Sequence, residues 1–225
     1  GRLSVKCEAM ATAIIFDLDG TLADSTACVV GAAQGVGRAA GLRAVSDEDI
    51  RQRIGEPLGP MLAALFGVSG QVLLDLVAAY SKEYVRLTAT LERPFPGTKP
   101  MLEVLRANGW KLAIATGKSQ NGAERATERM EIASYFDSIH GILPGTPGKP
   151  DPAVLRRALD ALKVTPDQAI MVGDTTYDLD LSAAIGVCNV AVAWGVHDEA
   201  ILRSRRPSFF AEDMKSLLEW LHQQG

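Results

Sequence analysis

The sequence predicts an α/β fold in which a doubly wound parallel sheet is interrupted by an inserted helical domain. Short, continuous apolar runs recur along the chain, and amphipathic helical patterns separate them. After the first apolar run, however, residues 24–93 contain helical patterns and no convincing strand. The composition, 47% apolar and 22% charged, is that of an ordinary globular protein with enough material for a packed core.

The first predicted strand is the run Ala13–Phe16, whose four residues are all apolar. A run without alternation is typical of a strand buried on both faces of a parallel sheet. Three later runs have the same character: Lys111–Ala115, Ala169–Val172 and Asn189–Trp194. The core helices are predicted at Met101–Asn108, Ala153–Lys163, Thr176–Ile185 and Met214–His222.

The long segment between the first and second strands reads as four helices, Ala27–Ala40, Asp47–Ile54, Pro57–Phe66 and Gln71–Leu91. A crossover of this length is too large for one helix. We therefore expect residues 24–93 to form a separate helical domain, and residues 10–23 and 94–225 to form the sheet-containing core. Residues 1–9, which precede Met10, are expected to be a leader or an expression remnant.

The charge balance excludes some classes of partner. The net charge is −4 and no long basic run occurs, which argues against nucleic acid. No apolar run approaches the length of a membrane span, and residues 1–9 lack the apolar stretch of a secretory signal. We expect a cytoplasmic protein without a membrane partner; the sequence leaves open whether it is a monomer or a homodimer.

Ligands of an open parallel sheet bind at the carboxyl ends of the strands. Asp17 and Asp19 directly follow the first predicted strand. Residues two apart on an extended chain face the same side, so both carboxylates can meet one site. Two carboxylates this close tend to split their pKa values, which suits a nucleophile and a general acid. Carboxylate oxygens are also ligands that Mg²⁺ prefers.

Three more motifs fall at comparable positions. Thr116-Gly117-Lys118 follows the second strand and offers a hydroxyl and amides to a phosphate. Lys149, before a predicted helix, can neutralise charge on a phosphoryl group. Asp174 and Asp178 add two carboxylates after the third strand. Each motif alone is common in ordinary turns, but all of them in this order favour one site.

These residues resemble the haloacid dehalogenase superfamily over nearly the whole chain. The most specific segments are Phe16-Asp17-Leu18-Asp19-Gly20-Thr21-Leu22-x-Asp24-Ser25 and Gly173-Asp174-Thr175-x-x-Asp178. The helical insert is similar to the C1 cap of subfamily I, and the core to the family's Rossmann-like sheet of five or six strands.

The resemblance implies a phosphatase mechanism. Asp17 would be the nucleophile that accepts the phosphoryl group, and Asp19 would protonate the leaving alcohol and then activate water. Thr116 would hydrogen-bond the phosphoryl oxygens, and Lys149 would pair with Asp17 and the phosphoryl group. Lys118 is expected either to help bind the phosphate or to be solvated.

The resemblance also implies a Mg²⁺ site. The ion would be held by the Asp17 carboxylate, the Asp19 backbone carbonyl and Asp174, and Asp178 would orient a metal-bound water. True dehalogenases of the family lack the second aspartate of the first motif, so Asp19 favours phosphoryl transfer here.

The segment Arg53-Ile54-Gly55-Glu56-Pro57-Leu58 most resembles phosphoglycolate phosphatase-type members. Arg53 is therefore a candidate substrate contact from the insert, although a solvated helix face explains it equally simply. The expected substrate is a small phosphomonoester, phosphoglycolate-like or a sugar phosphate. Two alternatives stay open: a phosphomutase of the β-phosphoglucomutase type, and a non-catalytic binding or regulatory protein.

Overall fold

The structure, a computed structural model, describes residues 10–225; the leader predicted over residues 1–9 lies outside them. The chain divides into two compact units. Asp24–Arg93 form a helical unit, and the chain before and after this segment forms a core unit. Each unit is described by itself.

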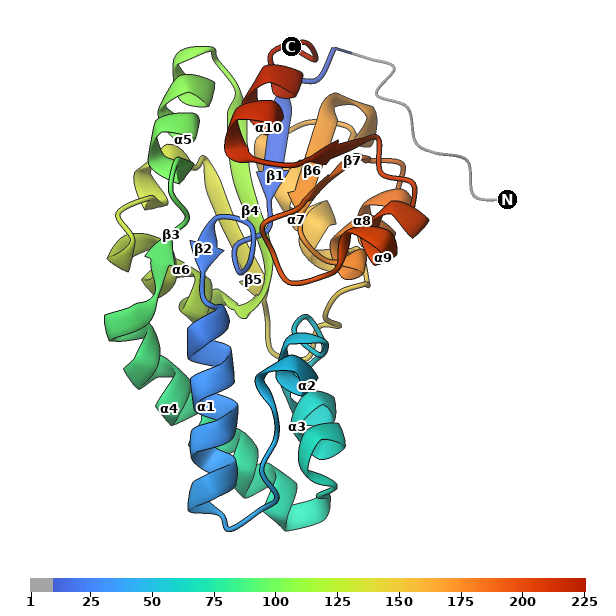
Figure 1. The fold of residues 1–225 in the computed structure, drawn as a ribbon. Helices are drawn as coiled ribbons and strands as arrows, with labels where there is room; N and C mark the ends of the chain where they lie inside the picture. Colours follow the sequence, from blue (N-terminus) through green and yellow to red (C-terminus); the bar gives the residue numbers. More distant parts are fainter. Residues whose placement is uncertain (1–9) are drawn as a thin grey trace. The chain divides into compact units, whose positions relative to one another are not determined.

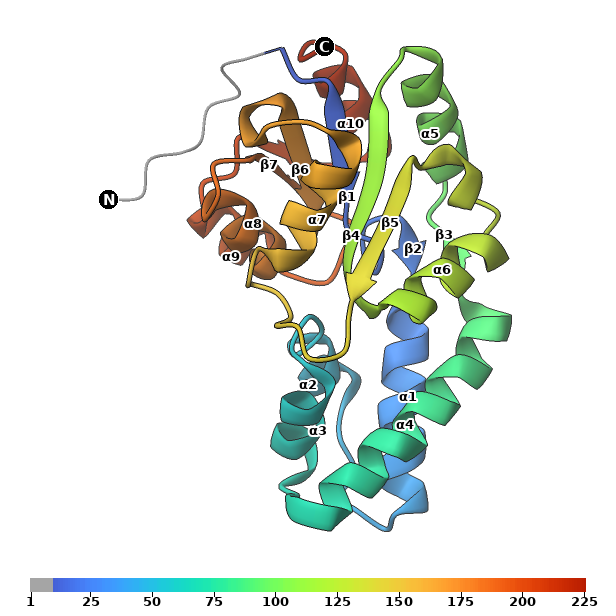
Figure 2. The same ribbon diagram turned by 180° about the vertical axis from the view of Figure 1, so that it is seen from behind.

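A six-stranded sheet forms the centre of the core unit, and every neighbouring pair of its strands is parallel (Figures 1 and 2). The strand order is β5-β4-β1-β6-β7-β8. β1 lies in the middle of this order, where Ala13 pairs with Lys111 of β4 and Ala169 of β6. The bounds are β1 Ala13–Phe16, β4 Lys111–Ser119, β5 Ser138–Ile142, β6 Ala169–Gly173, β7 Cys188–Val192 and β8 Phe209–Ala211.

Helices cover both faces of this sheet (Figure 1). Ile14 and Phe16 of β1 pack into a cluster with residues of α5 and α10, whereas Ala13 and Ile15 pack into a cluster with α7. This alternation follows from the two-residue period of a strand, and it explains why the strand is apolar at every position. The helices are α5 Thr98–Ala107, α6 Gln120–Arg129, α7 Ala153–Leu162, α8 Thr176–Ala183, α9 Glu199–Ser204 and α10 Met214–Leu221.

The helical unit has a hydrophobic cluster of its own. Its helices are α1 Thr26–Ala39, α2 Asp47–Arg51, α3 Leu58–Phe66 and α4 Gly70–Leu91. α1 approaches α3 closely, since a Cβ on Gly37 would lie 2.4 Å from the Phe66 ring. Where the chain passes between the units, β2 (Ala23–Asp24) and β3 (Arg93–Pro94) form a two-stranded sheet.

The parallel sheet and the helical insert agree with the fold class expected from the sequence. The sequence did not predict β5, β8, α6 or α9, and it ended the strand β4 too early. Among residues 10–225, no single helix is long and apolar enough to cross a membrane. Only α3 and α4 taken together, with a 115° bend between them, meet that test of length and composition.

Candidate active site

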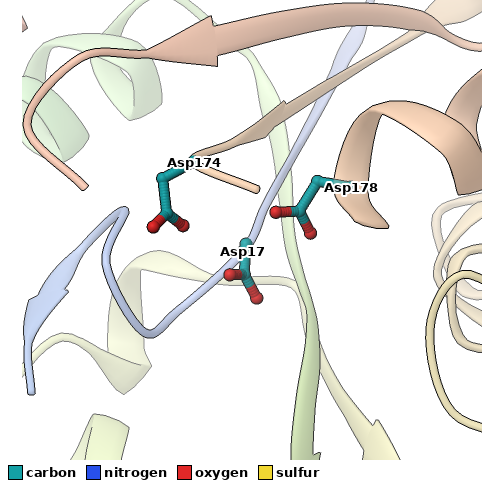
Figure 3. Close-up of side chains that lie close together, drawn as sticks. All are labelled: Asp17, Asp174 and Asp178. Atoms are coloured by element: carbon teal, nitrogen blue, oxygen red, sulfur yellow. The ribbon is translucent and has the colours of Figure 1, made fainter. Parts of the chain in front are cut away.

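Three buried aspartates meet at the carboxyl end of the central strands. Asp17 directly follows β1, Asp174 directly follows β6, and Asp178 lies in the first turn of α8. One carboxylate oxygen from each lies within 4.8 Å of the others. Figure 3 shows the three side chains pointing toward a common space. β1 and β6 are neighbours in the sheet, so residues that follow them are brought side by side.

Lys149 joins two of these carboxylates. Its Nζ donates to Asp17 Oδ1 at 2.8 Å and to Asp178 Oδ1 at 2.5 Å. Lys149 is itself buried, and the two carboxylates raise its pKa above the ordinary value despite the opposing effect of burial. It is therefore a fixed positive charge beside Asp17.

Further hydrogen bonds hold the carboxylates of Asp174 and Asp178. Asp174 accepts from Thr21 Oγ1 at 3.0 Å on Oδ1 and from the Val196 amide at 2.9 Å on Oδ2. Asp178 Oδ2 accepts from Thr175 Oγ1 at 2.7 Å and from the Thr175 amide at 3.1 Å. The bond from the Thr175 amide is part of the capping box at the start of α8, in which the Asp178 amide donates to Thr175 Oγ1, so the helix N-terminus fixes the rotamer of Asp178.

Asp19 is the more exposed carboxylate of the first motif. Its Oδ1 forms an ion pair with Lys118 Nζ at 3.1 Å. Lys118 was expected to help bind the phosphate or to be solvated. In the structure its side chain is largely buried against Asp19, which disfavours the solvated alternative and leaves phosphate binding a prediction. Thr116 is buried, and its Oγ1 accepts from the Lys118 amide at 3.3 Å.

The sequence placed Thr116-Gly117-Lys118 after a strand, and this was wrong by a few residues. β4 continues to Ser119, so the motif lies within its carboxyl end. The pairing with β5 shifts register between Ala115 and Ser119, which marks an irregularity at the motif. Such a bulge re-aims side chains and amides at a sheet end.

Two glycines leave room for the acidic side chains. Gly20 has φ +80°, and a Cβ there would lie 2.1 Å from Asp174 Oδ2. A Cβ on Gly173 would lie 2.4 Å from the Asp178 side chain. Only glycine permits both the turn after Asp19 and this close approach.

The site carries an excess of negative charge. Burial, followed by the charge of Asp178, raises the pKa of Asp17 to about 7, although Lys149 opposes the shift. Burial, then Asp17 and Asp178, also raise the pKa of Asp174 well above its ordinary value. Both carboxyls would hold a proton more tightly than a solvated aspartate, first because they are buried and also because one lysine does not balance three carboxylates.

This donor set fits a hard divalent cation. Buried charges require pairing or metal coordination, and oxygen ligands suit Mg²⁺. A cation among Asp17, Asp174 and Asp178 would relieve the repulsion that helps to raise the pKa values of Asp17 and Asp174. The structure thus provides a buried acidic triad capable of holding a metal.

The structure brings most of the predicted site residues into one region of the core unit. Asp17, Lys149 and Asp178 are joined directly, Asp174 lies within the same triad, and Lys118 contacts Asp19. Arg53 belongs to the helical unit, where it pairs with Glu56 at 3.0 Å.

Sequence reasoning missed the two groups that hold Asp174 in place, the Thr21 hydroxyl and the Val196 amide. Thr21 lies inside the first motif, so its hydroxyl was a visible signal. Val196 acts through its backbone amide, so its residue type gives no sign of this contact.

Comparison with known proteins decides the family. The family model described as "Haloacid dehalogenase-like hydrolase" matches residues 14–192. The chain belongs to this family. A solved haloacid dehalogenase-like family hydrolase from Streptococcus pneumoniae superposes with a TM-score of 0.87 at 30% identity, covering 94% of this chain and 98% of that one. The predicted fold class and family are therefore confirmed.

Proteins similar in sequence to this chain carry different names. A protein of Caldanaerobacter subterraneus with a provisional pyrophosphatase name, PpaX, is 32% identical over 210 residues, 92% of this chain and 93% of that one. A phosphoglycolate phosphatase of Rhodospirillum rubrum is 30% identical over 221 residues, 94% of this chain and 91% of that one. Tyrosine-protein kinase PtkA of Mycobacterium tuberculosis is 32% identical over 182 residues, 81% of this chain but 62% of that one. Family and relatives together confirm the predicted enzyme class, a phosphatase.

Proposed function

We propose that this enzyme is a Mg²⁺-dependent phosphatase that hydrolyses a small phosphomonoester through a phosphorylated Asp17. The observation that carries the proposal is the buried triad of Asp17, Asp174 and Asp178 with Lys149 bound to two of its members. Phosphoryl transfer depends on positioning and charge neutralisation, and this site supplies a fixed carboxylate, a fixed cation and a metal-binding donor set.

In the first step, an oxygen of Asp17 attacks phosphorus and the bond to the leaving alcohol breaks. Asp19, which is half-exposed beside Lys118, is placed to give the leaving oxygen its proton. In the second step Asp19 takes a proton from water, and the water oxygen attacks the phosphoryl group and releases Asp17. The partial exposure of Asp19 suits this exchange of protons with solvent.

Lys149 keeps Asp17 oriented and offsets negative charge as the phosphoryl group transfers. Thr116, with Gly117 and Lys118, is proposed to bind the phosphoryl oxygens at the irregular end of β4.

A bound Mg²⁺ would offset the repulsion between an anionic nucleophile and an anionic substrate. The Asp17 carboxylate, the Asp19 carbonyl and Asp174 are its proposed ligands. Asp178, whose two oxygens are already bonded to Lys149 and Thr175, is proposed to act beside the ligands.

The proposed substrate is a small phosphorylated metabolite, phosphoglycolate-like or a sugar phosphate. The names of the relatives, a pyrophosphatase and a phosphoglycolate phosphatase among them, support a small anionic phosphate compound without choosing one. The net charge of −4 is in keeping with a partner other than nucleic acid. The helical unit, with Arg53 as a candidate contact, is proposed to act as a cap that supplies specificity, and the location is proposed to be cytoplasmic.

The test is phosphate release from phosphoglycolate, pyrophosphate, glucose 6-phosphate and β-glucose 1-phosphate, with Mg²⁺ and with EDTA. We expect release only with Mg²⁺, and a loss of at least about 10³-fold in Asp17→Asn, because the nucleophile's charge is gone. Asp160→Asn, an exposed aspartate of α7, is the matched control and should keep full activity.

Unchanged activity in Asp17→Asn would refute the mechanism. Equal activity with EDTA and with Mg²⁺ would refute the proposed metal dependence. Conversion of β-glucose 1-phosphate to the 6-phosphate without phosphate release would assign the protein to the phosphomutases instead.

A further inference from the structure

The loop that follows β7, residues 193–198, makes several contacts with the site although no proposed catalytic group lies on it. The Val196 amide donates to Asp174 Oδ2 at 2.9 Å. The Trp194 indole Nε1 donates to the backbone carbonyl of Thr21 at 2.9 Å. Further along, His197 Nδ1 accepts from the amide of Thr176, the first residue of α8, at 3.1 Å.

Together with a bond from Thr21, these hydrogen bonds surround Asp174. Thr21 Oγ1 donates to the other oxygen of Asp174, Oδ1, at 3.0 Å. The loop after β1 and the loop after β7 thus each hold one oxygen of the same carboxylate, and Trp194 ties the two loops together. Asp174 is fully buried, so water does not compete for these bonds.

Gly195 lies against Asp174, and its lack of a side chain makes this close approach possible. A Cβ at this position would lie 2.1 Å from the Asp174 Cβ and 2.3 Å from Oδ2. The backbone of Gly195 is not in the left-handed region, so the requirement for glycine comes from the approach of Asp174 alone. The backbone of the loop therefore packs directly against one side of the Asp174 carboxylate.

We propose that Thr21, Trp194 and the Gly195–Val196 backbone are positioning residues that fix the carboxylate of Asp174 for divalent metal. The inference rests on the proposed metal site. Each oxygen of Asp174 has one hydrogen bond, which leaves further lone pairs for a cation, and a preset rotamer removes the entropy cost of orienting the ligand. Neither Trp194 nor Gly195 touches the reacting atoms, and both act through Asp174.

The direct test is Mg²⁺ affinity by isothermal titration calorimetry, without substrate. Thr21→Val keeps the shape and removes the Oδ1 donor, and should raise the Kd for Mg²⁺ by about tenfold or more. Trp194→Phe keeps an aromatic ring and removes the indole donor that ties the loop to Thr21, and should raise the Kd by a smaller factor. Gly195→Ala, which collides with Asp174, should have the largest effect.

Two control variants separate positioning from general damage. Trp220→Phe alters an equally half-buried tryptophan that stacks on Phe209, and Gly59→Ala adds a methyl group where no atom lies within 4 Å. Both should bind Mg²⁺ as the wild type does. A positioning role also predicts that excess Mg²⁺ restores most of the activity of Trp194→Phe, which loss of fold would not allow.

The outcomes are distinguishable. A wild-type protein that binds no Mg²⁺ would overturn the proposed metal site itself. Wild-type binding with an unchanged Kd in Thr21→Val and Trp194→Phe would leave the proposed function intact and overturn the positioning role. An unchanged Kd in Gly195→Ala would show that the loop does not constrain Asp174.

Discussion

At the scale of single residues, the site combines positions that sequence reasoning can find with contacts that it cannot. Asp17 and Asp174 were predicted because each follows a strand, and neighbouring parallel strands bring such residues together. The ion pair between Lys118 and Asp19 follows no spacing rule, since it joins the ends of two different strands. The bond from Thr21 to Asp174 spans 153 positions, which no local pattern encodes.

The raised pKa of Asp17 makes a prediction about stability without metal. The pKa of Asp17 in the fold is about 7, against 3.8 for a solvated aspartate. Between these values the folded protein binds more protons than the unfolded chain, so the free energy of unfolding decreases as pH rises from about 4 to 7. The raised pKa of Asp174 acts in the same direction.

Thermal unfolding in EDTA at several pH values, for wild type and Asp17→Asn, would isolate this contribution. The Tm of the wild type minus the Tm of the variant should become more negative as pH rises through this range. The reason is that only the wild type has to ionise the buried carboxyl of Asp17. Protons compete with metal for the same oxygens, so Mg²⁺ should raise the wild-type Tm more at pH 8 than at pH 5. A Mg²⁺ effect that does not depend on pH would contradict the competition.

At the scale of secondary-structure elements, those with a strong apolar pattern were predicted correctly, and those with a weak one were missed. β1 and β6 are continuous apolar runs and were found where expected. β5 has the sequence Ser-Ile-His-Gly-Ile and lies at an edge of the sheet, so it lacks a continuous run. α6 buries only Ala123, Ala126 and Thr127, whose small side chains leave no hydrophobic stripe to detect.

The start of α10 offers a test of element stability. Asp213 accepts from the Ser216 amide at 2.7 Å in a capping box, and Leu217 and Leu221 of the same helix are fully buried. Asp213→Ala should destabilise the protein by about 1 kcal/mol, or roughly 2–4 °C in Tm. Glu212→Ala, next to it and exposed, should change little. Equal Tm values for the two variants would show that the cap is not needed.

At the scale of the whole molecule, the sequence indicated two units because strand patterns disappear between residues 24 and 93. The structure divides the chain there too, and each unit has its own hydrophobic cluster. The proposed role of the helical unit in substrate binding has no comparable signal in the sequence. A lone arginine such as Arg53, paired with Glu56, has no pattern that separates binding from solvation.

Hydrogen exchange would show how far metal binding extends through the molecule. All proposed metal ligands and the loop of residues 193–198 belong to the core unit, so Mg²⁺ should slow exchange at residues 17–21, 174–178 and 194–197. The amides of residues 24–93 should exchange as before, because no proposed ligand lies in the helical unit. Protection of those helices by Mg²⁺ alone would mean that metal binding also orders the insert.

The central place of β1 in the sheet has a consequence for folding during synthesis. Ala13 pairs with Lys111 and Ala169, so the apolar segment Ala-Ile-Ile-Phe leaves the ribosome long before either partner strand. At about 5–20 residues per second the delay amounts to several seconds at least. The hydrophobic cluster of the intervening helices is made of residues from their own segment, so we expect the helical unit to form while β1 is still unpaired. An exposed apolar strand is prone to aggregation, and the yield of folded enzyme should therefore depend on how quickly β4 and β6 arrive.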